Sequence, residues 1–173
     1  PLGRQLISDV ITLMGHEVKI IAPASKEVTD FGDRFIPIGK PRSIPSSDSI
    51  VRISISLRLA SRIKEVLSRE KFDIVHLHEP FMIMLCSAVL RFSNTVNIGT
   101  FHAADGKPGY GFGWPIGLMI LRKRRRKLDG KIAVSRPAMN YASKYVPGQY
   151  EIIPNGVDIE RFTPDVAPIE QFC

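Results

Sequence analysis

Apolar residues recur along this chain in two alternating patterns, one helical and one extended. The apolar positions of residues 7–14 recur at helical spacing and Gly15 follows them, which predicts a helix that ends at a glycine C-cap. The next stretch, Glu17–Ala22, is short and apolar and stops at Pro23, which is typical of a buried strand. A helix followed by a strand is half of a βαβ unit.

The same alternation continues to residue 153. Further strands are predicted at Arg34–Ile38, Ser49–Ile55, Asp73–His78, Thr95–Phe101, Lys131–Val134 and Tyr150–Ile153. Further helices are predicted at 59–67, at 80–92 with Pro80 in the first turn, at 116–128, and from the cap residue Ser135 to about Tyr145. The Pro- and Ser-rich stretch 41–49 is interpreted as an exposed loop. Strands that alternate with helices predict an α/β, Rossmann-like parallel sheet with helices on both faces.

The order of these elements carries one further expectation. In a doubly wound sheet the first strand usually lies centrally, beside the crevice that binds ligands. This chain starts with a predicted helix, so the sheet is expected to be split and its first strand to be missing from the chain.

Composition narrows the class of protein. The chain has 173 residues, 44% of them hydrophobic, which suits one domain with a full core. The longest uncharged apolar stretch, residues 80–90, is too short to cross a bilayer, and no secretion signal is visible. Cys86 and Cys173 have neither metal-ligand spacing nor the pattern of a disulfide framework. A cytoplasmic location is therefore expected.

Charge indicates an anionic partner. The net charge of +7 favours nucleic acid, acidic lipid or phosphorylated substrates without choosing among them. The run RKRRRK at 122–127 is either a solvated helix end or, with Arg58, Arg62 and Arg69, a surface for anionic lipid. Nucleic acid is disfavoured, because the sequence has no RNA-binding aromatic signature, zinc finger or clear helix-turn-helix pattern.

Three polar clusters follow predicted strands, at residues 76–79, 102–107 and 155–158. Ligands of open α/β sheets bind outside the carboxyl ends of the strands, so these clusters are the candidate site. His102 either contacts a sugar or phosphate or simply ends its strand, and Lys107 either binds an anionic group or is a solvated loop lysine.

Two other chemistries receive less support. His76 and His78 face the same side of one strand, with Glu79 nearby, but no third strong ligand is evident, so packing and hydrogen bonding are favoured over a metal site. The glycines of 109–113 do not complete a dinucleotide fingerprint, because Trp114 stands at its last position. A flap over a substrate and a plain surface loop both remain open for this segment.

Four motifs in order carry a family resemblance: GHEVKIIAP at 15–23, FDIVHLHEP at 72–80, GTFH at 99–102 and IPNGVDIERF at 153–162. Together they resemble the N-terminal domain of retaining GT-B glycosyltransferases, and especially the bacterial phosphatidylinositol mannosyltransferase group. The resemblance covers nearly the whole chain. It implies half of a GT-B fold, with residues 1–153 as a Rossmann-like domain, 154–173 as the start of an interdomain linker, and the donor domain absent.

The resemblance also implies roles for particular residues. His102 matches the cleft histidine beside the donor sugar and is the implied catalytic residue. Lys107 matches a lysine that binds the acceptor phosphate, and Gln5 resembles a glutamine that touches the inositol head group. Other matches are Gly3, which resembles a glycine close to the donor phosphates, and Arg58 and Arg62, which fall on the helix that docks on acidic membrane. Ala103 and Ala104 depart from the hydroxyl residues common in the mannosyltransferases.

The implied function is transfer of a hexose, such as mannose from GDP-mannose, with retention, to a lipid-linked or phosphatidylinositol-type acceptor. It needs no obligatory metal or other cofactor, because such folds hold the diphosphate with basic side chains and helix N-termini. The implied location is peripheral, on the inner face of the cell membrane. The isolated chain is expected to be inactive, since the cleft needs both walls. The alternative is a noncatalytic basic α/β module that binds acidic lipid or nucleic acid.

Overall fold

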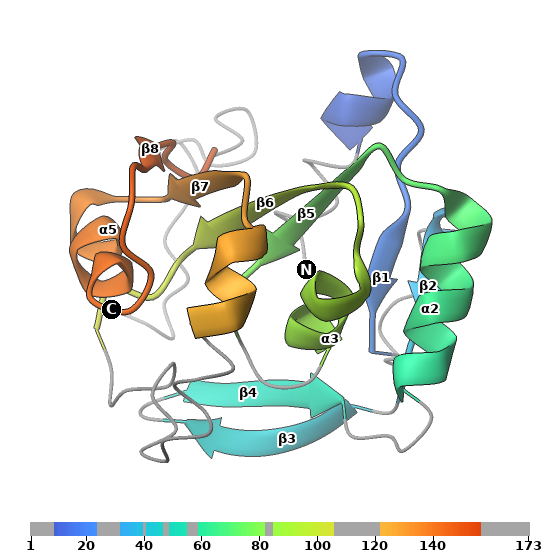
Figure 1. Cartoon of the computed structure of the whole chain (residues 1–173), viewed down its shortest axis with the longest axis horizontal. Helices are drawn as coiled ribbons and strands as arrows, with labels where there is room; N and C mark the ends of the chain where they lie inside the picture. Colours follow the sequence, from blue (N-terminus) through green and yellow to red (C-terminus); the bar gives the residue numbers. More distant parts are fainter. Residues whose placement is uncertain are drawn as a thin grey trace, which may run out of the picture.

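The described strands form two parallel groups and one hairpin (Figure 1). The computed structural model describes residues 9–23, 32–39, 59–81, 85–105 and 122–156, and the backbone of 41–46 and 49–54. The larger group is a four-stranded parallel sheet whose strands, in spatial order, are β5 (Ile74–His78), β6 (Val96–Phe101), β7 (Gly130–Ala133) and β8 (Glu151–Ile152). The smaller parallel group joins β1 (Ile20–Ala22) to β2 (Phe35–Pro37).

Helices cover the parallel strands on both sides. In Figure 1, the helices α3 (Leu85–Phe92) and α5 (Arg136–Ser143) lie below the strands of the larger sheet, and the helical residues 9–13 lie above them. The helix α2 (Leu59–Glu70) lies to the right of β1 and β2 in this view. Two short 3₁₀ helices, η1 (Gly32–Arg34) and η2 (Arg125–Lys127), complete the described elements. The predicted α/β, Rossmann-like parallel architecture is confirmed, and it is consistent with half of a GT-B fold. Within the described residues, no helix combines the length and apolarity needed to cross a membrane.

The parallel strands are divided, as the order of elements led us to expect. Hydrogen bonds pair β1 with β2 and β5 with β6, and no described strand joins β1 to β5. The expectation of a strand before Pro1 stays a prediction.

The interpretation of residues 41–49 as an exposed loop was wrong. Pro41–Ser46 is a strand, β3, that pairs antiparallel with β4 (Ser49–Ser54) from Pro41↔Ser54 to Ser46↔Ser49. Proline and serine favour turns in general, which is why the stretch was misread. A two-stranded hairpin leaves one edge of each strand unpaired, and proline is tolerated at such edges.

The residues predicted to cap helices do so in the structure. The amide of Gly15, with φ of 89°, donates to Thr12 O, and the amide of His16 donates to Ile11 O, which together form a Schellman motif. Ser135 caps α5, because its hydroxyl accepts a hydrogen bond from the Ala138 amide. Of the other three predicted helices, α2 extends beyond its predicted end to Glu70, α3 is described from Leu85, and the described end of the 116–128 helix includes η2.

The core lies between the parallel strands and the helices α2, α3 and α5. Phe101 at the end of β6 is fully buried and contacts the Tyr150 ring edge to face, with centroids 5.5 Å apart. Ile63 and Val66 of α2 and Leu90 of α3 belong to the same cluster of buried residues. This packing fixes where β6 ends, and so where the chain emerges at His102.

Candidate functional site

The carboxyl ends of β5 and β6 bring the first two predicted polar clusters together. The two strands are parallel, and His78 is in register with Thr100. Glu79 and His102 therefore leave the sheet at the same edge, where the His102 residue is exposed. The structure thus brings His78 and Glu79 of the first cluster to His102 of the second. We call this group of His76, His78, Glu79, Thr100 and His102 the histidine rim.

Three imidazoles form a row along the histidine rim. His78 Nδ1 lies 2.9 Å from His102 Nε2, with the ring centroids 5.2 Å apart and the ring planes 27° apart. This arrangement suits a hydrogen bond between the ring edges. His76 lies on the other side of His78, with centroids 4.8 Å apart and planes 23° apart, which is a stacked pair.

Glu79 holds the backbone that carries His102. Its Oε1 accepts hydrogen bonds from the amide of His102 at 2.6 Å and from the amide of Ala103 at 2.8 Å. Glu79 has φ of 53°, in the left-handed region that few residues other than glycine adopt. The Glu79 amide in turn donates to Thr100 O at 2.8 Å. The strained turn is thus tied to β6 at both its main chain and its side chain.

His76, at the inner end of the row, contacts Thr100. His76 Nε2 lies 2.7 Å from Thr100 Oγ1, and Thr100 is buried. Burial of the imidazole lowers the pKa of His76 below 6.5, and the nearby charge of His102 lowers it further. The row therefore has a neutral inner end and an exposed outer end at His102.

The metal hypothesis for His76 and His78 gains no support from this geometry. Within the described residues, no group of three or more His, Cys, Asp or Glu side chains is placed to hold a metal ion. The contacting nitrogens of the two histidines instead face Thr100 and His102. These contacts are the hydrogen bonding that the sequence favoured over a metal.

The structure describes only some of the other predicted site residues. Gly3, Gln5, Arg58 and Lys107 lie outside the described residues, and so does Asp158 of the third polar cluster. Asn155 of that cluster is exposed after β8, whose carboxyl end lies at the same edge of the sheet as the histidine rim. Arg62 is exposed on α2, where its guanidinium lies 3.2 Å from Glu65 Oε2.

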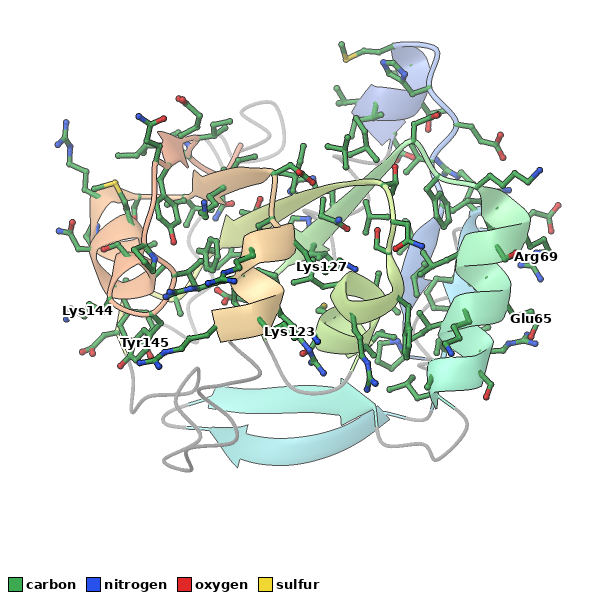
Figure 2. All side chains as sticks on the ribbon, viewed as in Figure 1. Glu65, Arg69, Lys123, Lys127, Lys144 and Tyr145 are labelled. Atoms are coloured by element: carbon green, nitrogen blue, oxygen red, sulfur yellow. The ribbon has the colours of Figure 1, made fainter. Side chains whose placement is uncertain are left out.

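The outer side of α2 carries charges of both signs. Glu65 and Arg69 project from this side of the helix (Figure 2). Arg69 also pairs with Glu70, at 2.6 Å between Nη2 and Oε1. Three cations and two carboxylates give the helix a net charge of +1, so α2 by itself attracts an anionic surface only weakly.

In the basic segment, residues 122–127, some side chains bond to neighbouring elements and others are exposed. Lys127 Nζ donates to Arg91 O at 2.9 Å and to Ser93 O at 2.5 Å, and so caps the C-terminal end of α3. Arg125 donates to Tyr145 O at 3.3 Å, and Arg124 donates to Ser87 Oγ. The other three cations of the segment are exposed: Arg122, Lys123 and Arg126.

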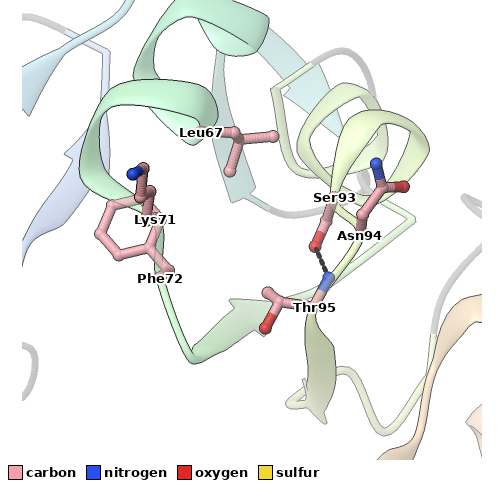
Figure 3. A pocket seen from close by; sticks show the side chains of 6 residues that line it. All are labelled: Leu67, Lys71, Phe72, Ser93, Asn94 and Thr95. Carbon is pink, nitrogen blue, oxygen red and sulfur yellow. Dashed lines mark hydrogen bonds between the residues drawn. The ribbon is translucent and has the colours of Figure 1, made fainter.

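A small hollow lies at the opposite end of β5 and β6 (Figure 3). It has a volume of about 170 Å³ and is lined by Leu67, Lys71, Phe72, Ser93, Asn94 and Thr95. Ser93 Oγ, one of its polar groups, accepts a hydrogen bond from the Thr95 amide. The hollow faces the amino ends of the strands and so is separate from the histidine rim.

Sequence reasoning missed two features of the histidine rim. It named Glu79 as a member of a polar cluster and as a neighbour of a metal hypothesis but gave it no contact with the backbone at His102, and it did not pair His78 with His102. The signal was present, since both histidines stand at the ends of predicted strands that follow one another along the chain.

Comparison with known proteins decides the family. Residues 7–161 match the model of Glycosyltransferase Family 4. The chain belongs to this glycosyltransferase family. The resemblance drawn from the four motifs is therefore confirmed at family level.

Curated relatives of this family 4 chain are bacterial. The phosphatidyl-myo-inositol mannosyltransferase of Mycobacterium tuberculosis (strain ATCC 25618 / H37Rv) is 30% identical over 156 residues, which cover 90% of this chain and 40% of the relative. The protein of the same name from Mycobacterium leprae is 29% identical over 157 residues, covering 91% and 41%. That from Propionibacterium freudenreichii is 27% identical over 154 residues, covering 86% and 40%. The chain thus spans about 40% of the length of these relatives.

Proposed function

We propose that the protein is a retaining hexosyltransferase and that this chain forms the acceptor-side wall of its cleft. Residues 1–153 would be the Rossmann-like domain, and 154–173 the start of the linker to a donor-binding domain. The observation that carries the proposal is the position of His102. Its imidazole is exposed at the carboxyl edge of a parallel sheet, in a chain of glycosyltransferase family 4.

The histidine rim suits the work such a transfer requires. The bond between the anomeric carbon and the donor diphosphate breaks, and the acceptor oxygen bonds to that carbon from the same face. The acceptor proton passes to the departing diphosphate, so the chain need not supply a covalent nucleophile. Its task is to orient the sugar and acceptor and to stabilise developing charge, for which the held imidazole of His102 is suited.

The substrates are proposed from the relatives and from charge. The relatives' name supports mannose, from a donor such as GDP-mannose, and a phosphatidylinositol-type acceptor. In this proposal Lys107 binds the acceptor phosphate, Gln5 contacts its head group, and Gly3 lies near the donor phosphates. The net charge of +7 favours such anionic substrates.

We place the enzyme at the inner face of the cell membrane, as a peripheral protein. The family resemblance assigns docking to the helix that carries Arg58 and Arg62. The exposed cations Arg122, Lys123 and Arg126 would add to the attraction, with each basic residue near an anionic surface contributing about 1 kcal/mol.

The central test is His102→Ala in the full-length protein, assayed for transfer of radiolabelled mannose from GDP-mannose to phosphatidylinositol. Loss of one preorganised hydrogen-bonding group should lower kcat by about 100-fold or more. His16→Ala is the matched control, because His16 is also exposed but precedes β1, away from the histidine rim. Unchanged transfer by His102→Ala would remove the key residue of the proposal.

The second candidate, a noncatalytic basic module, rests on the exposed cations of the basic segment. It predicts binding to acidic lipid or nucleic acid that neither variant of the central test alters, and no sugar transfer by the wild-type protein. The isolated 173-residue chain is expected to be inactive under the first proposal. Sugar transfer by that chain alone would contradict the need for two walls.

A further inference from the structure

The His102 imidazole is held at one of its two ring nitrogens. His78 Nδ1 lies 2.9 Å from His102 Nε2, and the amide of His102 donates to Glu79 Oε1 at 2.6 Å. The side chain and the main chain of one residue are therefore fixed by two consecutive residues at the end of β5. His102 Nδ1 has no hydrogen-bond partner among the residues that the structure describes.

We propose that His78 and Glu79 are positioning residues for His102, and that His102 contacts its ligand through Nδ1. Glu79 fixes the backbone as it leaves β6, and His78 fixes the ring orientation and the tautomer. The identity of the ligand as a substrate sugar or phosphate rests on the proposed function. The positioning itself rests only on the geometry of the histidine rim.

The hydrogen bond shared by His78 and His102 links the tautomers of the two rings. A neutral imidazole carries one N–H, and only one hydrogen can lie between Nδ1 of His78 and Nε2 of His102. If His78 donates it, His102 carries its own hydrogen on Nδ1 and offers a donor to the ligand. If His102 donates it, Nδ1 becomes an acceptor. In either arrangement His102 Nε2 is hydrogen-bonded to His78, and Nδ1 faces the ligand either as a donor or as an acceptor.

Glu79 contributes through the main chain. Its single oxygen accepts two consecutive amide hydrogens, from His102 and Ala103, just where the strand ends. These are charge-assisted bonds, which are about twice as strong as bonds between neutral groups. Without them the turn after Phe101 is free to reorient, and the ring would lose its position relative to His78.

The first experiment reads the tautomer without any assay of activity. In the full-length protein labelled with ¹⁵N-histidine, the two ring nitrogens of His102 are assigned by their loss in His102→Ala. One tautomer should dominate in the wild type. His78→Phe keeps a stacking ring but removes the hydrogen bond, and should shift His102 toward a mixture of tautomers. His78→Asn, whose amide reaches the position of Nδ1, should retain the wild-type signature.

The second experiment separates the two nitrogens by activity. The amide of His102→Asn falls near the position of Nδ1, whereas that of His102→Gln falls near Nε2. His102→Asn should therefore retain more transfer than His102→Gln. His78→Phe should lower kcat about 10-fold with little change in KM, because a misplaced reacting group alone can cost up to about 100-fold.

The outcomes distinguish this inference from the proposed function. Unchanged ¹⁵N shifts of His102 in His78→Phe would overturn the positioning role, whether or not the protein transfers sugar. Higher activity of His102→Gln than of His102→Asn would overturn the assignment of Nδ1. Absence of transfer by the wild type, with the tautomer shift observed, would reject the proposed function and leave the positioning role intact.

Discussion

The histidine rim and the basic segment are both clusters of one kind of residue, but the fold uses them differently. The rim collects three imidazoles from two strand ends that lie 24 positions apart along the chain. The basic segment is contiguous in sequence, yet its six cations separate into three that bond to neighbouring elements and three that are exposed. The histidines, which are far apart in the sequence, lie together in the fold. The cations of the basic segment, which are adjacent in the sequence, do not form one surface.

The difference follows from topology. Parallel strands deliver their carboxyl ends to one edge, so polar residues that follow separate strands converge there. A short run at a helix end turns about 100° with each residue, so its side chains point in different directions. Contiguous charge is therefore weaker evidence for a binding surface than polar residues at neighbouring strand ends.

The largest effect is expected at Glu79. Glu79→Ala removes two bonds from amides to a charged acceptor, each contributing about 1.5 kcal/mol, so the free energy of unfolding should fall by about 3 kcal/mol. Urea denaturation of the purified protein measures this change. Glu79→Gln keeps an acceptor oxygen and should recover part of the loss. Equal stability of the wild type and Glu79→Ala would show that the rim is not held in the way the hydrogen bonds indicate.

The sequence predicted more of the fold than of the site. Periodicity located the parallel strands, and Gly15 and Ser135 marked helix ends correctly because caps are local. The strand β4 was predicted, but β3 and therefore the hairpin were missed, since prolines in an edge strand look like loop residues. The pairing of His78 with His102 was also missed. Their places at the ends of consecutive predicted strands indicated that they could be close, but the contact itself depends on the register between the strands, which no local pattern encodes.

Within the basic segment, a bonded cation and an exposed one should contribute differently to stability. Lys127→Met removes two hydrogen bonds, to Arg91 O in the last turn of α3 and to Ser93 O just after it, so the free energy of unfolding should fall by about 2 kcal/mol. Arg126→Met, one residue away and exposed, should change it by less than about 0.5 kcal/mol. Thermal and urea unfolding of the two variants provide the measurement. Losses below about 0.5 kcal/mol in both variants would mean that the whole segment is a single solvated patch.

Binding to anionic vesicles separates the exposed cations of the two basic regions. Arg126→Gln should weaken binding to phosphatidylinositol-containing vesicles by about 1 kcal/mol, or roughly five-fold. Arg62→Gln should weaken it less, because Glu65 already neutralises Arg62 in part. Vesicle sedimentation at low and high salt tests this order. A larger loss in Arg62→Gln would show that α2 contributes more to the attraction than the exposed cations of the basic segment.

The smallest effect is the pH dependence that the rim should have and the basic segment should lack. Burial lowers the pKa of His76 in the folded protein, so on acidification the unfolded chain takes up a proton before the folded one does. The contribution of His76 is therefore complete above the unfolded pKa of about 6.5, and the free energy of unfolding falls as the pH drops below that value. His76→Gln has no such group, and its stability should decline less between about pH 6.5 and 5.5. Parallel curves for the variant and the wild type would mean that the imidazole of His76 is hydrated in the folded state, and that the row of histidines has no neutral inner end.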